Sequence, residues 1–378
     1  MTGRAPETCF VAKARPGMIH TMEHRGHGRF ALVDTDDDHV LGMCAAVDGL
    51  FGKPECGTYE LFGWAPEGAE IQGWVGDRVW LLPDDDAFGP WLLEDARSLG
   101  RHPGMGGLVL TGLDDYEGPP EGYRGRVRVH DEYRWLGFCV EFARILPPEQ
   151  ITPPLVLRGL APSGRLRAAL AKGTRRALNL EEIALEIRDD QGELLTDRVQ
   201  RAKVKTWHPS STGTDLIDLE LDGRGFTPVP DHLRPLWERW FTGPPDTPNT
   251  WADLDTRHRA AWLDLVRGRG CRLSHRDRPA GRAYELDGRH VTDEPGLFLA
   301  LGEAVNGPGG YFGGCLAALD DCLGGTFGYT APATLLWRDA ATAREHLSQT
   351  LTPDGEPCDL FAGILDVLAE GGMHVTMA

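Results

Sequence analysis

The chain has 378 residues, of which 41% are apolar and 25% charged, so it is long enough for two or three domains with buried cores. Gly and Pro together make up only about a fifth of it, which excludes collagen, coiled coil and wholesale disorder. No apolar run approaches the roughly 20 residues of a membrane helix, and the N-terminus lacks the apolar stretch of a signal peptide. We therefore expect a cytoplasmic protein.

The charge balance is strongly acidic, with 57 Asp and Glu against 39 Lys and Arg and a net charge of −18. Such a surface repels nucleic acid and attracts cationic partners. The eight cysteines include no C-x-x-C pair, and their spacing matches neither a zinc site nor a disulfide framework. We therefore predict reduced, buried cysteines, no metal and no cofactor.

Residues 1–29 are predicted to form a polar N-terminal arm. Within it, His20, Glu23 and His24 match the H-x-x-E-H pattern of zinc peptidases, which requires both histidines on one face of a helix. Proline and glycine residues flank the motif closely, so no long helix can form there. The motif is the only candidate for an alternative in which residues 1–240 carry an enzyme.

Residues 30–148 are predicted to form a β-rich domain, because short apolar runs alternate with turn residues. The spacing of Asp34, Asp36 and Asp38 begins like a calcium loop, but the Gly and Glu that such a loop needs are missing, so we predict a hairpin turn. The glycines at 104–107 lack the spacing of a nucleotide-binding loop. A proline cluster at 147–154 marks the predicted domain boundary.

Residues 155–245 are predicted to form a second β-rich region with a terminal helix, and residues 181–195 within it to form a hairpin. Residues 246–282 predict a helical, basic connector, because eight Arg oppose four Asp between Trp251 and Arg282. Its helix is expected to have a cap near Asn249 or Thr250. The Trp residues of this part are predicted to pack helices together.

Residues 283–378 differ from the rest in charge and in pattern. They contain 14 Asp and Glu against three Arg, a net charge of −11. Strand and helix patterns alternate along them, which predicts a small parallel sheet covered by helices. We therefore expect a multidomain α+β protein that is mostly β before this α/β domain, and we expect the domain to fold by itself.

The sequence Y-F-G-G-C-L-A-A-L-D-D-C-L-G-G, from Tyr311 to Gly325, resembles the loop and second helix of the barstar family, intracellular inhibitors of the ribonuclease barnase. Further segments are similar to that family's first strand and turn, its central strand, and its last helix and strand. In order, they lie at 285–291, 332–338 and 360–376. The resemblance implies a three-layer fold for residues 283–378 and does not extend to the preceding chain.

The resemblance also implies which residues meet a partner. Members of the family present carboxylates and a loop to the basic active site of a ribonuclease. By position, Asp321 matches the principal acidic anchor and Asp366 a peripheral acidic contact. Tyr311 and Gly313 match the contact loop, and Leu316 matches an apolar contact at the start of the helix.

Two positions depart from the family pattern. Ala317 stands where the family has a second interfacial carboxylate, and Asp320 stands where it has a Trp. Ala317 and Asp321 are one helical turn apart, so the carboxylate pair is broken. Asp320 lies about 100° around the helix from Asp321, and we keep it as a candidate contact.

We therefore predict a non-catalytic inhibitor or immunity-type protein that binds a basic ribonuclease or related toxin. The alternative is a scaffold or regulatory binding protein that uses the barstar-like fold for a non-nuclease partner, because fold does not fix function. Neither prediction includes a cofactor.

Overall fold

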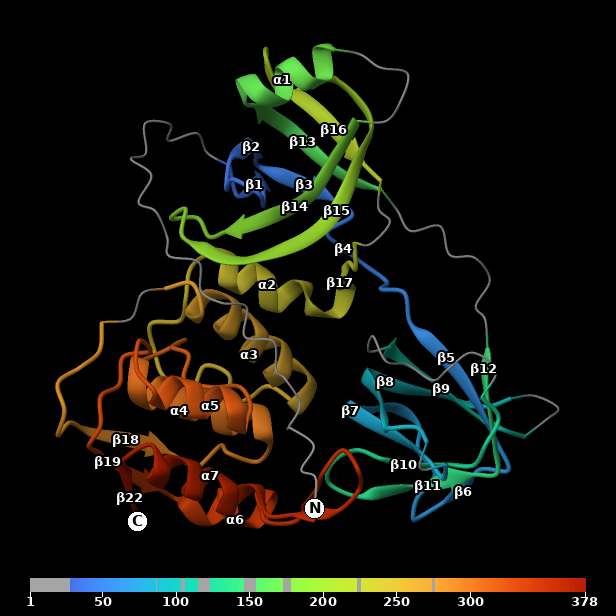
Figure 1. The fold of residues 1–378 in the computed structure, drawn as a ribbon, viewed down its shortest axis with the longest axis vertical. Helices are drawn as coiled ribbons and strands as arrows, with labels where there is room; N and C mark the ends of the chain where they lie inside the picture. The colour runs from blue at the N-terminus through green and yellow to red at the C-terminus, as the bar shows by residue number, and fades with distance from the viewer. Residues whose placement is uncertain are drawn as a thin grey trace.

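The structure, a computed structural model, describes residues 28–85, 87–102, 106–114, 123–145, 154–172, 178–222, 226–273 and 276–378. Figure 1 shows two β units and a C-terminal α/β unit, with helices α2 and α3 between the first β unit and the C-terminal unit. The prediction of a multidomain α+β chain that is mostly β before its C-terminal domain is confirmed. No helix in these ranges is long and apolar enough to cross a membrane.

The first β unit is a closed barrel. Its sheet has the order β16-β15-β14-β1-β2-β13-β3, and a further pairing of β13 with β16 joins the two ends of the six-strand series. Alternate residues point inward, so that Leu32, Leu185 and Leu219 are fully buried. The elements are β1 (Phe30–Asp34), β2 (Val40–Cys44), β3 (Ala46–Asp48), β13 (Leu155–Pro162), α1 (Gly164–Ala171), β14 (Leu178–Arg188), β15 (Leu194–Pro209) and β16 (Ile217–Leu221).

The second β unit has the strand order β12-β5-β9-β8-β7-β10-β11-β6. The two edges of this sheet meet. Strands β5 and β6, which lie near opposite edges, are separated by only Gly63 and Trp64, and they pair with β12 and β11 respectively. Tyr59, Leu81 and Phe142 lie in its core. The strands are β5 (Gly57–Phe62), β6 (Ala65–Pro66), β7 (Gly73–Pro83), β8 (Trp91–Arg101), β9 (Leu108–Asp114), β10 (Val127–His130), β11 (Trp135–Cys139) and β12 (Glu141–Ile145).

The strand pairing contradicts the predicted division into 30–148 and 155–245. Strands β1 to β3 pair with β13 and β14 across the proline cluster, and the second barrel is inserted between β3 and β13. Proline marked a real loop, but pairing between distant strands is not encoded in the local sequence. The short strands β4 (Phe51–Gly52) and β17 (Val229–Pro230) pair in parallel beside the first barrel.

The two predicted hairpins in the first barrel are confirmed. Strands β14 and β15 pair around the turn at 189–193, and β1 and β2 pair around the acidic turn. In that turn the Asp34 carboxylate accepts a hydrogen bond from the Asp36 amide and pairs with Arg165 of α1 at 2.7 Å. Asp37 pairs with the same guanidinium at 2.5 Å. The turn therefore ties the hairpin to α1.

The predicted basic connector is a packed element. It follows η1 (Asp231–Leu233) and α2 (Arg234–Phe241), and its helix is α3 (Thr256–Gly270). The N-cap is Asp255, whose carboxylate accepts from the His258 amide at 2.9 Å, so the predicted cap at Asn249 or Thr250 is wrong. Asp caps a helix as well as Asn does, and residues 249–254 form turns, so that the helix begins later than predicted. Helix α3 contacts β15, β7 and the C-terminal unit.

The C-terminal unit has the predicted small parallel sheet, in the order β18-β19-β22. Helix α4 has buried residues all round, as a helix covered on both sides should. The elements are β18 (Ala283–Asp287), α4 (Glu294–Asn306), α5 (Leu316–Leu323), β19 (Ala333–Arg338), α6 (Ala340–Leu347), β20 (Thr350–Leu351), β21 (Pro357–Cys358), α7 (Leu360–Glu370) and β22 (Met373–Met377).

The second barrel contacts the C-terminal unit at the β20–β21 hairpin. The Leu351 amide donates to the Glu132 carbonyl at 2.6 Å, and the His130 ring lies 3.2 Å from the Pro353 carbonyl oxygen. Gly355 sits against Trp135 so closely that a Cβ there would lie 2.5 Å from the indole. The hairpin is therefore a contact surface inside the molecule.

Candidate functional site

Helix α5 separates apolar and acidic residues on opposite faces. Ala318, Leu319, Cys322 and Leu323 are buried against the unit's core, while Ala317, Asp320 and Asp321 are exposed. The helical period of 3.6 residues produces this division. Both predicted acidic contacts on α5 are therefore at the surface.

The loop before α5 depends on a glycine. Gly313 has φ +97°, a left-handed conformation that favours glycine, and a Cβ there would lie 3.1 Å from the Leu319 Cα. The Cys315 sulfur then caps the helix by accepting from the Ala318 amide at 3.4 Å. Leu316, the predicted apolar contact, is half-buried and lies near Gly363 of α7. The loop is thus held tightly against α5.

Helix α7 lies beside α5 and adds a third carboxylate. Asp359 caps it by accepting from the Ala362 amide at 2.9 Å, and its apolar face is buried. The helices approach closely where α7 ends, since a Cβ at Gly371 would lie 2.7 Å from the Leu323 side chain. Asp366 is exposed.

The carboxylates of Asp320, Asp321 and Asp366 make no hydrogen bond or ion pair with any described residue. Two other acids of the unit, Asp287 and Glu285, are paired with arginines. Arg289 hydrogen-bonds Asp287 and holds the pKa of that carboxyl well below its usual range. Arg338 does the same for Glu285, lowering its pKa. The negative charge that remains for an external cation therefore includes the three carboxylates on α5 and α7.

Tyr311 is not accessible, which corrects the expectation drawn from the family's contact loop. Its side chain is 3% exposed, and burial raises its pKa. Its ring lies 5.9 Å from that of Phe327, and it hydrogen-bonds the Cys271 thiol. A Cβ at Gly270 would lie 2.2 Å from the Tyr311 Cβ, so the end of α3 rests directly on the loop. Gly313 is buried as well.

Residues 240–282, here called the collar, touch both the loop before α5 and the segment that follows α5. At the start of the collar, Trp240 and Pro245 pack on Gly309. At its end, the Asp277 carboxylate accepts from the amides of Thr326 and Gly328, at 2.9 and 3.0 Å. The charge pattern predicted a basic connector between acidic neighbours, and the packing of this connector on the loop was not predicted. The two glycines in the last turn of α3 were the available signal, because glycine inside a helix often permits close approach of another chain segment.

The collar is fixed to α4 by a buried ion pair. Arg259 of α3 is 6% exposed and Asp293 is 4% exposed, and their charged atoms are 3.1 Å apart. Arg259 also donates to Thr292 at 2.8 Å, while Asp293 caps α4 by accepting from the Gly296 amide at 2.8 Å. One carboxylate therefore both starts α4 and holds α3.

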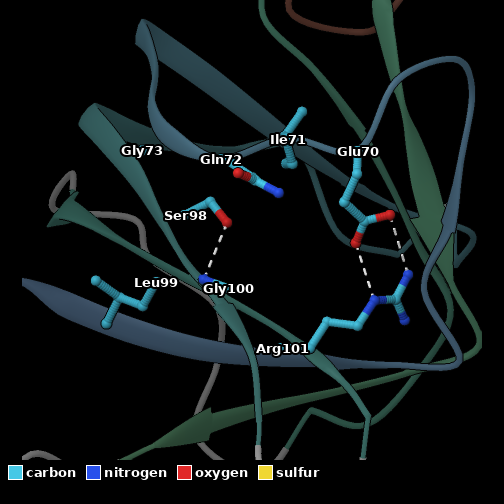
Figure 2. A pocket seen from close by; sticks show the side chains of 8 residues that line it. All are labelled: Glu70, Ile71, Gln72, Gly73, Ser98, Leu99, Gly100 and Arg101. Carbon is cyan, nitrogen blue, oxygen red and sulfur yellow. Dashed lines mark hydrogen bonds and ion pairs between the residues drawn. The ribbon is translucent and has the colours of Figure 1, made fainter.

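Two hollows lie elsewhere, and neither forms a convincing site. In the second barrel, Glu70 and Arg101 pair at 2.9 Å across a pocket of about 440 Å³ (Figure 2). The two charges neutralise each other. A wider hollow of about 870 Å³ on the first barrel is lined by both acids and bases, among them Glu182 and Arg201.

No group of three or more metal-capable side chains occurs among the described residues. The motif of His20, Glu23 and His24 lies outside the described residues, and so do residues 104 and 105 of the glycine-rich segment at 104–107. The seven described cysteines are free, and Cys44, Cys139 and Cys322 are buried.

Comparison with known proteins identifies one part of the chain. The model of the Barstar (barnase inhibitor) family matches residues 282–353, which include α5 and its preceding loop. The C-terminal unit is therefore a barstar-family domain. No curated protein and no solved structure matches the chain.

Proposed function

We propose that the barstar-family domain of this chain binds a basic ribonuclease or related toxin and blocks its active site with acidic side chains. The observation that carries the proposal is the set of exposed carboxylates without described partners on α5 and α7: Asp320, Asp321 and Asp366. Such carboxylates stand where the phosphates of an RNA substrate would stand. The protein has no catalytic role in this proposal.

Charge supports both the rate and the selectivity of such binding. The domain carries a net charge of −11, and a cationic partner is attracted before contact is made. Steering of this kind raises the association rate and is weakened as salt shortens the Debye length. Short-range pairs between carboxylates and arginine or lysine then slow dissociation.

A second function has a specific observation in its favour. Ala317 removes one carboxylate from the face, and the collar buries Tyr311. A domain that had become a scaffold or regulatory module for a non-nuclease partner would tolerate both changes.

Inhibition of barnase by the full chain separates the two functions. We expect the protein to suppress cleavage of an RNA substrate at equimolar amounts, and we expect the association rate to fall several-fold between low and high salt. A protein that leaves ribonuclease activity untouched at every salt concentration would favour the scaffold. Affinity capture with the full chain, followed by the same assay on the captured protein, would then identify the partner's class.

A further inference from the structure

The last turn of α3 and the residues after it, 267–273, form a segment here called the cover. It lies between the first barrel and the contact loop. On one side, a Cβ at Gly268 would lie 2.8 Å from Thr196 of β15, and Arg272 pairs with Asp197. On the other side, Gly270 touches Tyr311, as described above. The cover fills the space that a partner of Tyr311 would need.

The cover is itself basic. It contains Arg267, Arg269 and Arg272 and no acidic residue. Arg267 is exposed and close enough to Tyr311 and Cys271 to act on both by its charge. A segment with three arginines, two of them paired with Asp264 and Asp197, therefore lies beside a face that also carries acidic residues.

The cover is held to the C-terminal unit less firmly than the start of α3 is. The first part of α3 is fixed to α4 through the buried Arg259. The last turn of α3 contains two glycines, which have low helix propensity. Its polar contact with the loop is the hydrogen bond between Cys271 and Tyr311, and a thiol is a weak hydrogen-bonding group. Moving this turn away from the C-terminal unit would therefore break weaker contacts than moving the part of α3 that contains Arg259.

We propose that the cover is a built-in competitor for the partner-binding face, so that a basic ribonuclease reaches the Tyr311 side only when the last turn of α3 moves away. The inference rests on the proposed function, which it deepens with a means of regulation. With the cover in place, the binding face offers the carboxylates of α5 and α7 and not the Tyr311 side chain.

Gly270→Ala tests the cover, because its Cβ cannot be accommodated 2.2 Å from Tyr311 without separating the two segments. Gly164→Ala in α1 is the matched control, since a Cβ there meets nothing within 4 Å. The first readout needs no partner: nitration of Tyr311 by tetranitromethane, followed by mass spectrometry. We expect Gly270→Ala to be nitrated several-fold faster than the parent and the control. Fully buried Tyr329 should stay protected in all chains, which verifies folding.

The second readout is the association rate with barnase, which should rise in Gly270→Ala. If Gly270→Ala does not fold, Cys271→Ala removes the hydrogen bond to Tyr311 without a clash and should shift both readouts in the same direction. Equal nitration in parent and variant would overturn the inference, and so would an association rate that stays the same or falls. If barnase binds neither chain, the proposed partner is wrong, and Tyr311 nitration alone decides the inference.

Discussion

Asp321 is exposed on α5 at the position where the family places its principal acidic contact, and its carboxylate engages no described residue. One helical turn earlier stands Ala317, so no second carboxylate at that position contributes to binding. Asp321→Ala would leave the partner's cation desolvated and unpaired, which costs at least about 2 kcal/mol of binding, or roughly thirtyfold in Kd. Titration calorimetry against barnase measures it.

The control for this change is Glu345→Ala, which removes the same charge from an exposed position on α6. We expect it to change Kd less than about threefold, because exposed charges act through screened long-range attraction alone. The converse variant, Ala317→Asp, restores the carboxylate pair and should tighten binding. If Asp321→Ala binds as tightly as the parent, the partner does not use this face.

At the scale of elements, the junction of α3 and α4 depends on Arg259. Arg259→Ala leaves Asp293 ionised and buried, and breaking one side of a buried pair costs about 3–5 kcal/mol. Arg267→Ala in the same helix should cost less than about 1 kcal/mol, because its pair with Asp264 is exposed on both sides. Denaturant unfolding of both variants tests the contrast, and equal losses would show that the buried pair is not special.

The contact between α3 and β7 should make stability depend on pH. Burial raises the pKa of Asp77 to about 8, with Asp264, Glu94 and Asp95 adding to the rise and Arg78 opposing it. The unfolded carboxyl titrates near 3.8, so the folded chain binds the extra proton between these values. Stability contributed by the protonated form is therefore lost as pH rises from about 4 to 8.

Asp77→Asn mimics the protonated carboxyl and should remove that loss. We expect its unfolding midpoint in urea to exceed the parent's by a wide margin at pH 8.5 and by a much smaller margin near pH 5. Exposed Asp253→Asn is the control and should follow the parent at both pH values. If the parent's urea midpoint does not decrease from pH 5 to pH 8.5, the raised pKa of Asp77 is wrong.

At the scale of the whole molecule, the collar decides what can fold alone. Residues 283–378 by themselves would expose the side of α4 that α3 covers and would leave Asp293 without Arg259. We now propose that the folding unit begins near residue 231, with η1. A chain of residues 231–378 should melt cooperatively, and one of residues 283–378 should be several kcal/mol less stable or insoluble. Calorimetry of both chains tests this boundary. Equal melting temperatures would show that the folding unit begins at residue 283.

The sequence by itself determined the local elements and the C-terminal domain. The resemblance to the barstar family indicated Asp321 and Asp366, with Asp320 as a further candidate, and the helical period puts all three on outward faces of α5 and α7. The alternation of strands and helices predicted the parallel sheet. These properties depend on neighbours within one or two helical turns, or on a pattern repeated along the whole domain. The turn at Asp34–Asp38 was equally readable, because turn chemistry is local.

Only the tertiary structure decided how distant segments meet. Strands β1 to β3 close a barrel with strands more than a hundred residues later, and the second barrel lies between them in the chain. The burial of Tyr311 depends on Gly270, which arrives from a segment that the sequence indicated only as a basic connector. Pairing and close approach are set by the shapes of both surfaces at once. A single stretch of sequence describes only one of the two surfaces. The exposed carboxylates were therefore predictable, and the cover over Tyr311 was not.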